Sequence, residues 1–515
     1  MFRWRLLGFI ALVSAGVMLT LTAGAASAQV LAPKVQTPAI PANVDAFNLS
    51  FEDFKKYSTM KGFELVGQSY FKVPERAPWA KAQGRPGPET GSGFNTVRVY
   101  DGIAYLAGYN NPQTLFGVVI ADVRDPRNMK ELSFIPCNPG TRCNYLRVNR
   151  EKKILVLNHD NDLRNNPTKP PEGEKPKSGV SFYDVSDPSH PKQLAFVAFT
   201  PGGSGHGLDA DDKYAYSCGQ FSADLNREAL VIVDYSDPKN IHQVSTWHVP
   251  GMLKGEQFGP LNQKGPDGKQ QIIQCHEVEY YNDRLYVAWR DAGMVVLDIK
   301  DRTKPTLIAT YDYVPPFHGG GLGAAHTSLP VVTHPGEHPD LVIHTDEIFD
   351  CPPAFGRILD VSDLKAPEVA RGERPANVQQ LSTFRLDFVE DVFDPAKPTF
   401  VCPDGPGARA GASTHLPAID YRSPSLVYID WYDEGLHVMD ISNPFAPTFI
   451  GYYLSPRFVP LGAGPNEPHK VRHTREIWQD PDTNLLYLTD GNGGGLMVLR
   501  YTGPIPTKLP IPGAR

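Results

Sequence analysis

The chain repeats one short pattern six times: an apolar strand that ends in aspartate and runs into a tight turn. The six strands are residues 117–122, 180–184, 230–234, 294–298, 357–360 and 436–440. In each turn a second Asp or Asn follows three residues after the first, and in four of them proline comes next, as in residues 122–126 and 234–238. Asp and Ser side chains cap the backbone of a turn, and proline fixes a dihedral and stops a strand. We therefore expect these aspartates to be structural rather than catalytic.

Further strands flank each aspartate strand. A β-rich strand follows the turn, as in residues 130–135 and 243–247, and a strand rich in tyrosine or valine precedes the pattern. The preceding strand occurs seven times, at residues 103–107, 154–157, 214–217, 285–289, 341–344, 426–430 and 485–489. Each repeat thus holds about four short antiparallel strands, which is the content of one β-propeller blade.

The last repeat lacks a fourth strand, because residues 495–500 run directly into a proline-rich end. Residues 62–71 have the composition of that missing strand. Pairing them with the last blade would remove the exposed edge that an open array leaves. The sequence therefore predicts an all-β, seven-bladed propeller over residues 61–505, closed by this N-terminal strand. Residues 29–60 would form an arm packed outside it, and residues 506–515 a C-terminal tail.

One strand of the pattern carries a family resemblance. Leu230-Val-Ile-Val-Asp234 is, letter for letter, the consensus that names the LVIVD-repeat family, and the other five strands look like diverged copies of it. The resemblance covers nearly the whole chain after residue 60. It implies a β-propeller of the cell surface or periplasm, and it implies little about activity because the family is defined by its repeat.

The first 28 residues have the layout of an export signal. Arg3 and Arg5 form a short basic region, residues 6–21 are mostly apolar, and residues 26–28 provide small side chains for cleavage. We expect a mature chain that begins at Gln29 and is periplasmic or secreted, with no later membrane span. The charge of -7 and the lack of a basic run argue against nucleic acid as a partner.

Six cysteines in an exported chain could all be paired. Cys137 and Cys143 are close enough to join one loop, and Cys351 with Cys402 could tie the ends of a long insertion. Cys218 and Cys275 would then be left for each other. The alternative is that some of the six are free and buried, because sequence alone does not determine connectivity.

One position recurs just ahead of the first strand of each repeat. It lies about ten residues before the tyrosine-rich strand and is occupied, in repeat order, by Asn95, Asn144, His206, His276, His326, His415 and His473. The chain has only 15 histidines in 515 residues, so five in seven aligned places exceeds a random draw. In a propeller this position faces the central channel, where we expect the five imidazoles to converge and the two asparagines to complete the lining.

Converging neutral imidazoles are typical ligands of transition metals. Without a cysteine among them, they favour iron or copper, with zinc possible. Two alternatives stay open: a polar, water-filled channel mouth in which each imidazole is hydrogen-bonded to the backbone of a neighbouring blade, and acid–base chemistry without a metal.

Polar residues near these histidines are candidates for acid–base or substrate-binding roles. Asp209 follows His206, and Arg475 and Glu476 follow His473, with Arg475 suited to an anionic group. Strand alternation is expected to turn Glu277 away from the axis. The function that fits best is a metal-dependent oxidoreductase or oxygenase acting on a small organic substrate. The alternatives are a non-catalytic binding propeller and a metal-dependent hydrolase or lyase.

Overall fold

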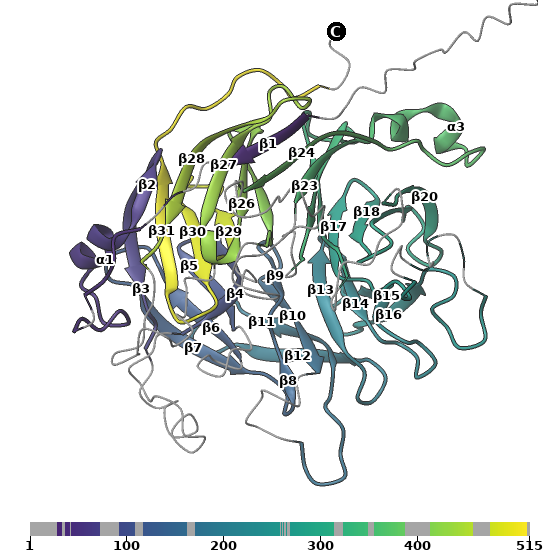
Figure 1. Ribbon diagram of the computed structural model, residues 1–515. Helices are drawn as coiled ribbons and strands as arrows, with labels where there is room; N and C mark the ends of the chain where they lie inside the picture. The colour runs from purple at the N-terminus through teal and green to yellow at the C-terminus, as the bar shows by residue number, and fades with distance from the viewer. Residues whose placement is uncertain are drawn as a thin grey trace, which may run out of the picture.

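The computed structural model describes residues 28–32, 35, 37–41, 43–72, 92–108, 117–161, 170–257, 259, 261, 264, 268–313, 323–348, 355–386, 413–456 and 474–511. Within them the strands form seven antiparallel sheets arranged around an axis (Figure 1). The expected export signal, except for its last residue, lies outside these residues. None of the helices in the described ranges is long and apolar enough to cross a membrane.

Each blade consists of four consecutive strands, numbered outward from the axis. Blades 1 to 3 contain β4 (Phe94–Tyr100), β5 (Ile103–Gly108), β6 (Gly117–Asp122), β7 (Lys130–Pro136); β9 (Leu146–Asn149), β10 (Ile154–Asn161), β11 (Gly179–Asp184), β12 (Lys192–Ala198); and β13 (Gly205–Ala210), β14 (Tyr214–Gly219), β15 (Ala229–Asp234), β16 (His242–Trp247). Blades 4 and 5 contain β17 (Glu277–Tyr281), β18 (Arg284–Ala288), β19 (Met294–Asp298), β20 (Thr306–Tyr311); and β21 (Ala325–Val331), β22 (Leu341–Asp346), β23 (Gly356–Asp360), β24 (Gln379–Leu386).

The last two blades complete the ring. Blade 6 contains β25 (Pro417–Asp420), β26 (Ser423–Asp430), β27 (Leu436–Asp440) and β28 (Thr448–Leu454), and blade 7 contains β29 (Thr474–Gln479), β30 (Leu486–Asp490), β31 (Gly495–Tyr501) and β3 (Phe63–Ser69). Strand β3 is antiparallel to β31, with Phe63 opposite Tyr501, and the two lie side by side in Figure 1. The predicted seven-bladed propeller and its closure by the N-terminal strand are confirmed.

The aspartate that ends each third strand caps the turn after it. In all six turns an aspartate oxygen accepts a hydrogen bond from the main-chain nitrogen two residues later, at 2.8 to 3.1 Å; the aspartates are Asp122, Asp184, Asp234, Asp298, Asp360 and Asp440. This geometry is the Asx turn expected from the sequence pattern. The repeated aspartates are therefore structural.

The N-terminal arm contributes more than external packing. It contains β1 (Ala28–Ala32), helix α1 (Phe51–Tyr57) and β2 (Thr59–Lys61). Strand β1 extends blade 5 by pairing in parallel with β24, and β2 extends blade 6 by pairing with β28. Phe54 and Tyr57 of α1 are buried in the core between blades 6 and 7. The arm thus joins three successive blades before β3 closes the ring.

The remaining short elements lie outside the blade plan. They are β8 (Thr141–Arg142), which pairs with β10, the 3-10 helices η2 (Ser362–Lys365) and η5 (Tyr432–Glu434), and helix α3 (Pro367–Ala370). The first part of the C-terminal tail packs on blade 6, where Ser423 donates a hydrogen bond to the carbonyl oxygen of Pro506 at 2.6 Å.

The hydrophobic core lies between the blades. One apolar cluster of buried residues fills each interface between neighbouring blades, such as the cluster of Leu230, Val278 and Trp289 between blades 3 and 4. Because every blade packs on two neighbours, the ring has no uncovered apolar edge. The inner strands β4, β9, β13, β17, β21, β25 and β29 contact one another in that order and surround the axis.

Two disulfide bonds are present, Cys137 to Cys143 and Cys218 to Cys275, as expected. Cys351 and Cys402 lie outside the described residues. The second bond links the end of β14 in blade 3 to the residue just before His276 in blade 4, and both of its cysteines are buried. It therefore holds together two blades that each contribute an imidazole to the axis.

Replacing Cys218 and Cys275 together by alanine is expected to lower the free energy of unfolding by about 2–4 kcal/mol, since the bond constrains a loop of roughly 57 residues in the unfolded chain. Urea unfolding followed by circular dichroism measures this loss. An unchanged transition midpoint would show that the interface between blades 3 and 4 holds without the bond.

Candidate metal centre

A closed circle of hydrogen bonds connects the seven blades at the axis. In each blade a donor reaches the main-chain carbonyl oxygen of one residue at or just before the inner strand of the next blade. The donor and acceptor residues, in order, are Asn95 to Asn144, Asn158 to His206, Gly207 to His276, His276 to His326, Thr345 to His415, His415 to Arg475 and Thr489 to Asn95. We call the seven acceptor residues the axial ring.

The axial ring contains four of the five predicted histidines and both asparagines, with one correction. The seventh place belongs to Arg475, and His473 lies outside the described residues. Strand pairing gives the same assignment: the bulge between Thr474 and Ile477 of β29 matches the bulge between Gly205 and Leu208 of β13. The turn between β29 and β30 is longer than the turn between β13 and β14, so counting back a fixed number of residues misplaced the position.

The four ring histidines form a continuous arc. Neighbouring ring centroids are 4.4 Å apart from His206 to His276, 4.3 Å from His276 to His326 and 4.3 Å from His326 to His415. All but His206 are buried. A Cβ atom at Gly207 would lie 2.3 Å from the carbonyl oxygen of His276, so glycine is what allows blades 3 and 4 to approach this closely.

Backbone contacts orient two of these imidazoles. Nδ1 of His276 lies 3.2 Å from the carbonyl oxygen of His326, and Nδ1 of His415 contacts that of Arg475. A carbonyl oxygen can only accept, so each Nδ1 carries the proton and each Nε2 has a free lone pair. These contacts match the non-metal alternative for the channel, and they also match the way metal-binding histidines are held.

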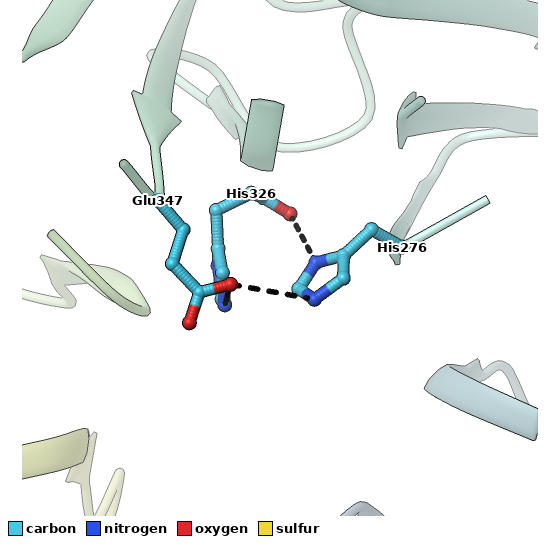
Figure 2. A group of neighbouring side chains, drawn as sticks. All are labelled: His276, His326 and Glu347. Atoms are coloured by element: carbon cyan, nitrogen blue, oxygen red, sulfur yellow. Dashed lines mark hydrogen bonds and ion pairs between the residues drawn. The ribbon is translucent and has the colours of Figure 1, made fainter. Parts of the chain in front are cut away.

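Glu347 completes a set of three converging ligand atoms. It follows β22, and its Oε2 atom lies 3.8 Å from Nε2 of His276 and 3.9 Å from Nε2 of His326 (Figure 2). One ligand atom from each of the three lies within 4.8 Å of the other two, and all three residues are buried. Nε2 of His326 has no hydrogen-bond partner among the described residues. Two histidines and one carboxylate are the donor set of non-haem iron(II) sites.

Glu347 itself is held by two neighbours at the same mouth of the channel. Arg290, just after β18, lies 2.9 Å from its Oε2 atom, and the Tyr432 hydroxyl donates to its Oε1 atom. Burial alone would raise the pKa of Glu347, but the charges of Arg290 and His326 outweigh it and lower the pKa to about 2. The carboxylate is therefore ionised.

The two imidazoles are neutral. Burial lowers the pKa of His326 to about 3, and burial together with the charge of Arg290 lowers the pKa of His276 well below its usual range. Neutral imidazole and ionised carboxylate are the protonation states that bind metals. The three residues thus fit a transition metal in both geometry and charge.

His206 and His415 flank this group on either side. Nδ1 of His206 lies 3.4 Å from Oδ2 of Asp160, which is paired with Arg142 at 2.6 Å. Within the described part of the chain, neither His206 nor His415 belongs to a set of metal-binding side chains as close as that of His276, His326 and Glu347. Their part in metal binding stays a prediction.

The structure places Asp209 and Glu476 away from the group. Asp209 accepts from Nε of Arg147 at 2.8 Å and from the main-chain nitrogen of Tyr280 at 2.6 Å. Glu476 binds Arg98 at 2.8 Å and the main-chain nitrogen of Val97 at 2.6 Å. Both carboxylates therefore join neighbouring blades. They were singled out for their nearness to histidines in the sequence, but their oxygens are occupied by structural contacts.

The remaining candidates do face the channel. Nε of Arg475 donates to Oδ1 of Asn95 at 2.8 Å, and its guanidinium lies 4.9 Å from the ring centre of Tyr432. Glu277 is two residues before Glu279 on β17, so the two share a face of the strand, and Glu279 lines a channel cavity. The expectation that Glu277 points away is wrong, because His276 precedes the strand and does not share its alternation.

The fold and the hydrogen-bond circle define a seven-bladed β-propeller. Two segments, residues 276–313 in blade 4 and 426–455 in blade 6, match the family model described as LVIVD repeat, so the chain carries LVIVD repeats and the resemblance is confirmed. The segment that suggested it, residues 230–234, lies outside both matches. No curated protein matches the chain.

Solved propeller structures are distant in sequence. The β-propeller domain of Cps50 (Swd1) from Myceliophteria thermophila is 12% identical, with a TM-score of 0.46, covering 79% of this chain and 96% of that one. Hydrazine synthase of Kuenenia stuttgartiensis is 13% identical, with a TM-score of 0.43 and coverage of 79% and 96%. Sqt1 of Saccharomyces cerevisiae is 9% identical, with a TM-score of 0.44 and coverage of 80% and 97%.

Proposed function

We propose that this chain is an exported, metal-dependent oxidoreductase whose metal is held by His276, His326 and Glu347 at one mouth of the propeller channel. The observation that carries the proposal is the convergence of two Nε2 atoms and one carboxylate oxygen in a buried place. Iron is favoured by the two-histidine, one-carboxylate set, and copper is the next choice. The substrate would be a small organic molecule.

The surrounding residues have definite tasks in this proposal. The carbonyl oxygen of His326 orients His276, and Arg290 with Tyr432 orients Glu347. Arg475 and Asn95 lie on the opposite side of the axial ring, where they can bind a polar group of the substrate. A bound iron or copper ion would supply redox chemistry at this place. Zinc in the same ligands would instead favour a hydrolase or lyase, and a channel without metal would favour a binding propeller.

Metal analysis of the purified protein, after reconstitution with iron(II), copper(II) or zinc under matched conditions, tests the proposal. We expect close to one equivalent of one of these metals per chain. Less than about a tenth of an equivalent of each would contradict the metal centre and leave the binding propeller as the reading. The metal that is retained separates the redox reaction from hydrolysis.

Replacing Glu347 by glutamine is expected to weaken metal binding by at least about 100-fold, because loss of even an outer contact to a ligand costs 10- to 100-fold. Competition with a chromophoric chelator measures the affinity. His190→Ala, at an exposed histidine on the outer surface, is the control and should bind metal as the unaltered chain does. Equal affinity of the Glu347 variant would remove this carboxylate from the ligand set.

A further inference from the structure

The channel has a second charged level, three residues farther along each inner strand than the axial ring. In blades 1 to 4 this level carries Arg98, Arg147, Asp209 and Glu279, and in blade 7 it carries Trp478. These five residues line a cavity of about 280 Å³. Three residues of a strand span about 10 Å, so the cavity lies toward the opposite end of the channel from the metal centre.

Three of the four charged side chains are already satisfied. Arg147 is paired with Asp209 at 2.8 Å, and both oxygens of Asp209 accept hydrogen bonds. Arg98 is paired with Glu476 at 2.8 Å and lies 4.4 Å from the ring centre of Trp478. These contacts are the framework of the cavity, and the two guanidinium groups are occupied by carboxylates. An anion would therefore have to displace an existing ion pair.

The two glutamates of β17 are not satisfied. Glu279 makes no hydrogen bond or ion pair with any described residue, and both carboxyl oxygens of Glu277 lack a partner within the same ranges. Glu277 is fully buried, and it shares the channel face with Glu279. Buried polar groups in native proteins are nearly always paired, so two neighbouring exceptions call for a ligand that donates hydrogen bonds.

The charges around the cavity favour a cation. Four carboxyl groups, those of Asp209, Glu277, Glu279 and Glu476, meet the guanidinium groups of Arg98 and Arg147 only. Burial, with the charge of Asp209 beside it, raises the pKa of Glu279 to about 8. A positive charge placed beside Glu279 would relieve this repulsion. Calcium fits poorly, because it takes six to eight oxygen ligands and the oxygens of Asp209 and Glu476 are engaged.

Aromatic side chains complete the cavity. Trp478 and Tyr100 lie with their ring centres 5.7 Å apart in an edge-to-face arrangement, and Tyr280 also lines the cavity. Tyr100 and Tyr280 are partly exposed, so the cavity is reached from solvent at this end. Aromatic faces beside a carboxylate are a known combination for binding organic ammonium groups.

We propose that this cavity binds a small organic amine, whose ammonium group donates hydrogen bonds to Glu279 and Glu277 while its apolar part packs on Trp478 and Tyr100. The site is separate from the metal centre and does not rest on the proposed function.

Calorimetric titration with n-butylammonium chloride tests the proposal, with n-butanol and sodium butyrate as neutral and anionic probes of similar size. We expect saturable binding of the ammonium ion only. Glu279→Gln should weaken it at least tenfold, and Trp478→Leu, which keeps both carboxyl groups, should weaken it as well. Glu64→Gln, at an exposed ion pair with Arg500, is the matched control and should leave the affinity unchanged. Variants are compared only when their circular dichroism matches that of the unaltered chain.

The affinity should also rise with pH. The Glu279 carboxyl, which faces Asp209, Arg147, Arg98 and Glu476, must ionise to hold the cation, and a pKa of about 8 leaves roughly a tenth of it ionised at pH 7. Butylammonium binding is therefore expected to strengthen about tenfold between pH 7 and pH 9, and this gain should vanish in Glu279→Gln. Binding of butanol or butyrate instead, or equal affinity of the Glu279 variant, would overturn the proposal. Neither result would touch the metal centre, because His326→Ala should bind the amine normally.

Discussion

Replacing His326 by alanine is expected to remove nearly all bound metal from the reconstituted protein. His326 sits at the middle of the histidine arc, with ring centroids 4.3 Å from those of both His276 and His415. Its Nε2 atom is buried without a hydrogen-bond partner among the described residues and lies 3.9 Å from Glu347. We expect a loss of affinity well beyond 100-fold, since a direct ligand contributes more than the outer contacts whose loss costs 10- to 100-fold.

The arc itself offers matched comparisons for this variant. His206→Ala and His415→Ala remove imidazoles from the same ring without touching the three converging atoms, so each should weaken metal binding by about tenfold at most. The double variant His276→Ala with His415→Ala should lose the metal, because it removes one of the three. Unchanged metal content in both His326→Ala and the double variant would show that the axial ring does not hold the metal.

Replacing Glu476 by alanine is expected to destabilise the fold by about 3–5 kcal/mol, because it leaves Arg98 buried without its charge partner. The side chains of Arg98 and Glu476 are 6% and 7% exposed, and the pair joins blade 1 to blade 7 where the ring closes. Chemical unfolding measures the loss.

The control for this prediction is Glu64→Ala, which breaks an exposed pair with Arg500 on the closing strand and should cost about 0–1 kcal/mol. The comparison also separates two roles for Glu476. A catalytic Glu476 would lower turnover while leaving the unfolding midpoint in place, whereas a clamp between blades lowers the midpoint and leaves metal content unchanged in the folded fraction.

The blade plan could be predicted because it depends on local chemistry. The aspartate turns recur at one place in each repeat, and their side chains cap the backbone in the way that the residue types dictate. Closure followed from a general property of sheets, since the edge of β31 had to be covered and residues 63–69 had the right pattern. The strands that the arm adds to blades 5 and 6 carry no comparable signal, because outer edges pair through the backbone.

The axial ring could be predicted only where turn lengths agree between blades. Arg475 takes the place expected for His473 because the turn before β30 is longer than its counterparts. Asp209 and Glu476 show the other limit: nearness to a histidine in sequence says little about nearness in space, since three residues of strand span about 10 Å.

Glu347 was missed because it belongs to a different column of the repeat. It follows the second strand of blade 5, as Arg290 follows that of blade 4 and Tyr432 follows that of blade 6. All three reach the same mouth of the channel and contact one another. Alignment of the residues after the second strand in each repeat would have brought this carboxylate to attention beside the histidines.

The metal centre is tested most directly by anomalous X-ray scattering from crystals of the reconstituted protein, recorded on both sides of the absorption edge of the bound metal. The account predicts one strong peak, about 2.0–2.2 Å from Nε2 of His276, Nε2 of His326 and a carboxylate oxygen of Glu347. A map without a peak among these three residues, or with its peak elsewhere in the propeller, would contradict it.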